Sequence, residues 1–139
     1  MKYRQILLPV IGSHADEEAV QLACRLGRQD KSRIRAINII TLKRDLPLDA
    51  EIEPEIQKAE EILGHIERIA LANSYRIDTD VLQSREVGPA IVNEAKEKDV
   101  DLILMGFAYK RHFGEFSLGD IVPYVLKNAS CRVMLYHIC

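Results

Sequence analysis

The stretch Met105–Asp120, "MGFAYKRHFGEFSLGD", holds the residues whose types and spacing most directly suggest chemistry. Gly106 and Gly119 bracket it. Its consecutive basic residues are Lys110, Arg111 and His112. Glycine lets backbone amides approach an anion, and the start of a following helix carries partial positive charge. The stretch therefore suits phosphate binding, and it equally suits a long connection with a solvated basic patch.

A second candidate is the turn "PVIGSHA", which follows the first apolar run. It offers only Gly12, so the Gly-x-Gly-x-x-Gly turn of dinucleotide-binding folds is absent. It also lacks the hydroxyl-rich turn of a flavodoxin, and no carboxylate ends the third strand as a phosphate-accepting receiver domain requires. Ser13 and His14 are adjacent and point apart, which disfavours a nucleophile and base pair. We expect Ser13 to cap a helix, with Asp16 three positions on.

Histidine and cysteine spacing gives no support for a metal site or a disulfide framework. No two histidines are four residues apart, and there is no Cys-x-x-Cys pair. The histidines are His14, His65, His112 and His137, and the cysteines are Cys24, Cys131 and Cys139. We expect a reducing, cytoplasmic setting.

Length and charge limit the classes of function. The chain has 139 residues, which suits one domain over 1–139, and its formal net charge is −2. Nucleic-acid-binding proteins usually carry a marked basic excess, so we do not expect a nucleic acid as a partner. The apolar run before Pro9 is far shorter than the roughly 18 residues of a membrane span. We predict no membrane insertion.

Apolar periodicity predicts an alternation of strands and helices. Strands are expected at residues 3–10, 32–40, 75–83, 100–106 and 131–137. Helices are expected at residues 15–29, from 51 or 54 to 73, at 88–99 and at 119–129. The third strand alternates polar and apolar residues, as a half-exposed edge strand does. Five strands separated by four helices predict an α/β fold with one open parallel sheet and helices on both faces. Such sheets bind ligands beyond the carboxyl ends of their strands.

The chain as a whole resembles the universal stress protein family. The similar segments are "ILLPVIGS", "VGPAIVNEAKEKDVDLILMG" and "LGDIVPYVLKNASCRVMLY". The resemblance implies a five-stranded parallel sheet of order 3-2-1-4-5, a Rossmann-like fold of the adenine nucleotide alpha hydrolase type. It also implies a homodimer joined through the last strand. More loosely, "LPLDAEIEPE" resembles stress-protein domains attached to amino-acid transporters, which makes a transporter a candidate partner.

ATP-binding members of that family carry Gly-x-x-Gly-x9-Gly-Ser/Thr. The matching positions are Gly106, Tyr109, Gly119 and Asp120, so two of the four agree. Those members also carry an Asp after the first strand, where this chain has Ile11. A carboxylate facing a phosphate at about 4 Å, in a dielectric near 20, costs roughly 4 kcal/mol. Alternatively, the carboxylate caps the last helix and occupies the amides that would hold phosphate.

By this resemblance we expect ATP or AMP binding, with Mg²⁺ bridging Asp120 to phosphate as an option. Expected near the base and sugar are Pro9, Val10 and Ile11. Expected around the phosphates and the strand end beside them are Met105, Gly106, Tyr109, Gly119, Asp120 and Ile121. No base or arginine is positioned for turnover, so a sensor or regulatory module is predicted rather than an enzyme, with weak ATP hydrolysis left open. A nucleotide-free interaction module, using the region of Lys43 and Arg44, is the competing hypothesis.

Overall fold

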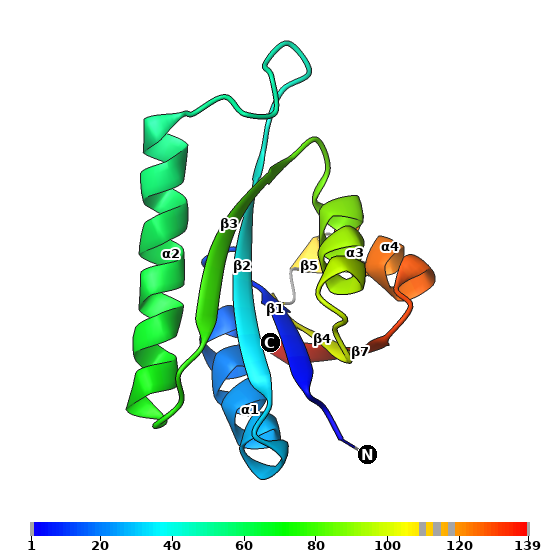
Figure 1. Ribbon diagram of the computed structural model, residues 1–139. Coiled ribbons are helices and arrows are strands. Elements are labelled where there is room, and N and C mark those ends of the chain that lie inside the picture. Colours follow the sequence, from blue (N-terminus) through cyan, green and yellow to red (C-terminus); the bar gives the residue numbers. More distant parts are fainter. Residues whose placement is uncertain (1, 109–110, 113–114, 117–118, 139) are drawn as a thin grey trace.

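Five parallel strands form one sheet in the computed structural model, which describes residues 2–108, 111–112, 115–116 and 119–138 (Figure 1). The order is β3-β2-β1-β4-β7, which is the predicted 3-2-1-4-5 order counted over the five long strands. Their bounds are β1 Gln5–Pro9, β2 Arg33–Thr41, β3 Asp78–Ser84, β4 Leu102–Ala108 and β7 Arg132–Ile138. β3 lies at one edge and β7 at the other, so the alternating third strand is an edge strand as predicted.

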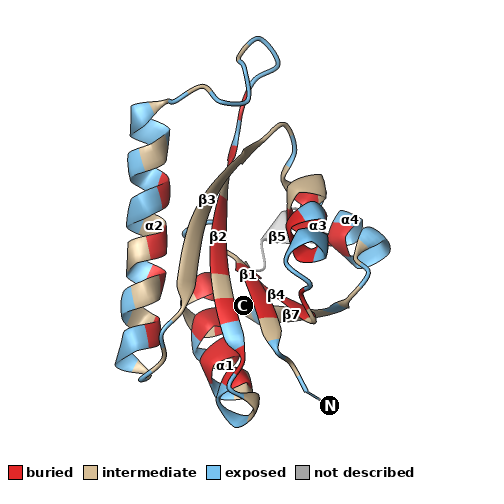
Figure 2. Ribbon diagram, viewed as in Figure 1, coloured by how far each residue is buried: buried red, intermediate tan, exposed pale blue. Residues whose placement is uncertain are grey.

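Two helices cover each face of the sheet. α1 (His14–Asp30) and α2 (Glu53–Ala72) pack on one face, whereas α3 (Val87–Glu97) and α4 (Ile121–Asn128) pack on the other (Figure 1). In Figure 2 the buried residues of α2 line the side that faces the sheet, and its outer side is exposed. None of the helices that the structure describes is both long enough and apolar enough to cross a membrane.

The central strands have apolar residues at consecutive positions, as is typical of strands that are buried on both faces. Leu8 points to the α1 and α2 side, and Leu7 points to the α3 and α4 side. Both side chains are fully buried, as are Ile103 and Leu104 of β4. Side chains alternate across a strand, so a strand covered on both faces needs an apolar residue at every position.

The stretch Met105–Asp120 is organised differently from the predicted loop. β4 continues past Gly106 as far as Ala108, where it pairs with Ile138 of β7. Beyond it, β5 (Arg111–His112) and β6 (Glu115–Phe116) form a short antiparallel pair. The last helix begins at Ile121 rather than Gly119, because Gly119 adopts φ +70°, a conformation outside the right-handed helix.

The central seam of the sheet is short. β1 and β4 are paired only at Ile6 with Leu102 and at Leu7 with Ile103. In contrast, β4 and β7 are paired over seven positions, from Leu102 with Arg132 onward. The two central strands therefore separate toward their carboxyl ends, and this is the place where the order of an open α/β sheet reverses and a ligand crevice is expected.

Candidate functional site

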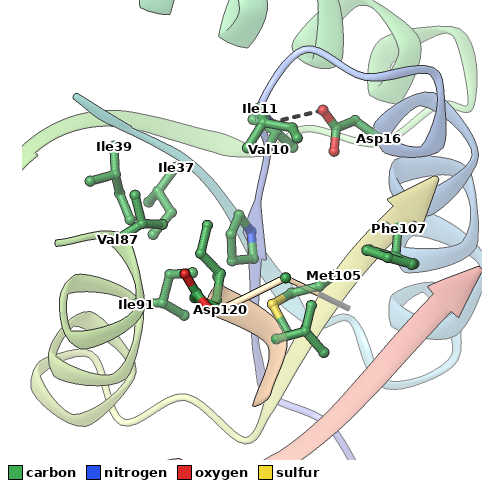
Figure 3. Close-up of a pocket in the computed structure, with 15 residues that line it drawn as sticks. Val10, Ile11, Asp16, Ile37, Ile39, Val87, Ile91, Met105, Phe107 and Asp120 are labelled. Carbon is green, nitrogen blue, oxygen red and sulfur yellow. Dashed lines mark hydrogen bonds between the residues drawn. The ribbon is translucent and has the colours of Figure 1, made fainter. Parts of the chain in front are cut away.

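A mainly apolar cavity of about 200 Å³ lies at the carboxyl ends of β1 and β4 (Figure 3). Eight of the nine residues predicted for the site line it. They are Pro9, Val10, Ile11, Met105, Gly106, Gly119, Asp120 and Ile121. The ninth, Tyr109, lies outside the described residues. The sequence prediction therefore placed two distant segments of the chain around one cavity.

Seven further lining residues were not predicted. They are Asp16, Ile37, Ile39, Val87, Ile91, Phe107 and Val122. β2 supplies Ile37 and Ile39, which are two residues apart and therefore point to the same face. The side chains of Val87 and Ile91 come from α3 and complete an apolar wall opposite β4 (Figure 3). Such a wall suits a flat, weakly polar ring better than a charged group.

The turn after β1 carries a buried carboxylate. Asp16 is 1% exposed, and one of its oxygens, Oδ2, accepts backbone N–H bonds from Ile11 at 2.9 Å, Gly12 at 2.7 Å and Ser13 at 2.9 Å. Burial raises the pKa of Asp16, while the three N–H donors oppose that rise. The amides of this turn, which would otherwise be available to a ligand, are thus already engaged by a residue of the chain.

Asp16 also fixes the start of α1. Ser13 is the N-cap in extended conformation, and Asp16 is at the third helical position, where its carboxylate satisfies the Ser13 amide. Ser13 is thus at the predicted N-cap position and Asp16 makes its half of the predicted contact, whereas Oγ of Ser13 is buried and makes no capping hydrogen bond. The backbone of the turn itself needs Gly12, which has φ +93°.

Asp120 does not act as the predicted side-chain cap of α4. It occupies the N-cap position with φ −98° and ψ −28°, and its carboxylate makes no capping hydrogen bond. A cap residue normally has extended backbone, which aims its side chain at the following amides; the helical ψ of Asp120 aims it elsewhere. The carboxylate is exposed and lies at the edge of the cavity.

Gly106 has a packing role that the sequence prediction did not assign. A β-carbon at this position would stand 2.7 Å from the carbonyl oxygen of Ala15 and 3.2 Å from its β-carbon. The predicted strand end at residue 106 is wrong, because β4 continues to Ala108 and Gly106 pairs with Tyr136 within it. Its absent side chain lets the first turn of α1 lie against β4.

Ile11 is placed at the rim of the cavity. Its side chain is 68% exposed. At Gly119, by contrast, an added β-carbon would meet no atom within 4 Å. Open space therefore lies beside the start of α4, whereas the exposed apolar side chain of Ile11 lies in the loop after β1.

Two histidines, His14 and His65, contact Glu17. Its Oε1 lies 2.7 Å from Nε2 of His65 and its Oε2 lies 3.1 Å from Nδ1 of His14. The pKa of Glu17 is lowered, first by the hydrogen bond to His65. Among the described residues, no group of three or more His, Cys, Asp or Glu side chains is arranged to hold a metal ion.

A parallel five-stranded sheet of this order, with an apolar cavity where its central strands separate, defines an α/β protein with a ligand crevice at the point of strand reversal. Residues 2–137 match the universal stress protein family, and the chain belongs to it. A universal stress protein of Methanocaldococcus jannaschii is 27% identical, over 96% of this chain and 81% of its own length.

Solved structures share the fold. A universal stress protein from Archaeoglobus fulgidus in complex with dAMP has a TM-score of 0.76 at 19% identity, covering 97% of this chain and 98% of its own. An Arabidopsis thaliana family member with AMP bound has a TM-score of 0.69 at 13% identity, covering 98% and 92%. A universal stress protein in complex with cAMP has a TM-score of 0.71 at 15% identity, covering 99% and 98%.

Proposed function

We propose that the protein is an adenine-nucleotide-binding regulatory or sensor module and not a turnover enzyme. The observation that carries this proposal is the apolar cavity between the ends of β1 and β4, which eight of the predicted residues line. The three family structures with dAMP, cAMP and AMP support the same ligand class, since each shares this fold.

In the proposed arrangement the base lies in the apolar part of the cavity. Val10 and Met105 are buried residues of its lining, and Ile11 covers the base from the rim. The sugar and phosphate then point toward Gly119 and the start of α4, where a β-carbon on Gly119 would meet no atom within 4 Å. The positive end of the α4 dipole favours an anion there, whereas the Asp120 carboxylate opposes it unless Mg²⁺ lies between them.

The direct test is calorimetric titration of the full chain with AMP and ATP, each with and without Mg²⁺, together with mass spectrometry of any ligand released from freshly purified protein. Saturable heat with AMP or a co-purified adenine compound supports the proposal. Absence of both at millimolar nucleotide would mean that the cavity does not serve nucleotides.

A nucleotide-free interaction module is the second candidate function. The observation favouring it is that Asp16 engages the amides of the β1–α1 turn, while Asp120 adds a second carboxylate at the cavity. The loop between β2 and α2, which contains Lys43 and Arg44, projects beyond the sheet and would meet a partner, for which a transporter is one option (Figure 1). Pull-down with this loop replaced by a Gly/Ser linker tests this use.

We also propose a homodimer through β7 and a cytoplasmic location. β7 is an edge strand of the sheet, and an apolar edge strand is normally covered. Sedimentation velocity of the native chain, compared with a Leu135→Lys variant, tests the dimer: the variant is expected to sediment as a monomer, and an unchanged dimer would place the interface elsewhere.

A further inference from the structure

The charged side chains that the structure describes at the cavity are acids. Among the described lining residues, Asp16 and Asp120 are the ionisable ones. An adjoining groove shares Val87, Asp120 and Ile121 with the cavity, and it adds Glu86 as a further acid. A ligand extending out of the cavity along α3 and α4 therefore meets carboxylates on two sides of its path.

The cavity itself suits an uncharged group. Its volume of about 200 Å³ is below the roughly 300–1,000 Å³ of sites that enclose a drug-sized molecule, so a base with its sugar is a better fit than a whole triphosphate. Most of its lining comes from aliphatic side chains. Among these, Ile37, Ile39 and Ile91 lie on one wall of the cavity (Figure 3).

Asp120 is the group that a phosphate would meet first. Its carboxylate is exposed and makes no capping hydrogen bond to α4, so its charge is not neutralised by the amides of that helix. The neighbouring Gly119 has no side chain, and a β-carbon added there would meet no atom within 4 Å. Repulsion between like charges grows with each phosphate added at this end of the ligand.

We propose that this site selects the nucleoside end of its ligand, so that affinity falls in the order adenosine, AMP, ATP, and that Asp120 is the residue which sets the order. The inference rests on the proposed function, because it assumes that an adenine compound occupies the cavity. It assigns the ligand class to nucleosides and short-phosphate nucleotides rather than to free triphosphates.

The test is calorimetric titration of the full chain with adenosine, AMP and ATP in the absence of Mg²⁺. We expect ATP to bind at least about tenfold more weakly than adenosine. Asp120→Asn removes the charge and keeps the shape, so it is expected to raise ATP affinity about tenfold while adenosine affinity stays within about twofold. Asp45→Asn, in the exposed loop after β2, is the matched control and is expected to change neither.

Salt dependence gives an independent readout. If carboxylates repel the phosphates, raising salt from about 0.05 to 0.5 M screens the repulsion and strengthens ATP binding. If the basic residues 110–112 attract the phosphates, the same change weakens it. Asp120→Ser, with unfolding in urea measured alongside, provides a second variant should Asp120→Asn fold poorly.

The outcomes separate the two proposals. Binding of adenosine with ATP equal or tighter, or an Asp120→Asn variant that leaves ATP affinity unchanged, overturns the selection by Asp120 and leaves nucleotide binding standing. Failure of all three compounds to bind to the wild type and to both variants overturns the proposed function itself.

Discussion

A β-carbon at Gly106 would stand 2.7 Å from the carbonyl oxygen of Ala15, so β4 and the first turn of α1 are in direct backbone contact at the cavity. Gly106→Ala is expected to destabilise the protein by about 1–3 kcal/mol, because either α1 or β4 must move. Urea unfolding measures the change. Gly64→Ala in α2 is the control: its β-carbon meets only Arg68 Nη1 at 3.4 Å, and it should stabilise by about 0.5–1 kcal/mol. Equal stability of Gly106→Ala and wild type would contradict the contact.

A second close contact joins α3 to α4. An added β-carbon at Gly88 would lie 2.8 Å from Cδ1 and 3.0 Å from Cγ of Tyr124. Gly88→Ala should therefore cost about 1–3 kcal/mol, and Tyr124→Ala in the same chain should recover part of that cost. Additive losses in the double variant, measured by urea unfolding, would show that the two positions do not interact.

The buried carboxylate of Asp16 should make stability depend on pH. Burial raises its pKa in the folded state above the ordinary 3.8 of the unfolded chain. A raised folded pKa gives a contribution that is full below the unfolded pKa and is lost as pH rises through the folded value. Asp16→Asn does not titrate and keeps an acceptor oxygen for the turn.

The free energy of unfolding of wild type, minus that of Asp16→Asn, is therefore expected to fall as the pH rises above about 4. Urea unfolding at several pH values measures this difference, since most other titrating groups cancel between the two proteins. A difference that rises with pH would mean that the three backbone donors outweigh burial.

A substitution at Ile11 should change ligand binding and leave the stability of the fold nearly unchanged. Its side chain is 68% exposed, so Ile11→Ala should change the free energy of unfolding by no more than about 0.5 kcal/mol. If the base packs under it, the same change should weaken adenosine binding about threefold to tenfold, because apolar area covered by the ligand is lost. Leu48→Ala, at another exposed aliphatic residue, serves as the control and should leave binding unchanged. Unaltered affinity in Ile11→Ala would place the base away from the rim.

The alternation of strands and helices and the parallel sheet could be predicted from apolar periodicity and the rules for βα units. The strand order and the residues on the two sides of the cavity were implied by the resemblance to the family and not by periodicity. The third strand, with Asp78 and Asp80 between apolar residues, was correctly predicted to be an edge strand. The contribution of β2 to the cavity was not predicted. Alternation along a strand puts Ile37 and Ile39 on one face, but it does not tell how far that face lies from β4.

The roles of Gly106 and Asp120 could not be predicted from the local sequence pattern. The role of Gly106 depends on Ala15, which is 91 positions away in the chain, and no spacing rule links such a pair. Asp120 has the residue type of a good cap, yet its backbone ψ of −28° turns the carboxylate away from that task. Residue type predicted the position, whereas the observed dihedral angles decided the role.

The two-position pairing of β1 with β4 divides the ladder of the sheet into two groups of strands, β3-β2-β1 and β4-β7. The cavity lies between their carboxyl ends, with Pro9 and Ile37 on one side and Met105 and Phe107 on the other. A ligand held there would therefore contact both groups of strands at once and add a non-covalent bridge where the backbone pairing has ended.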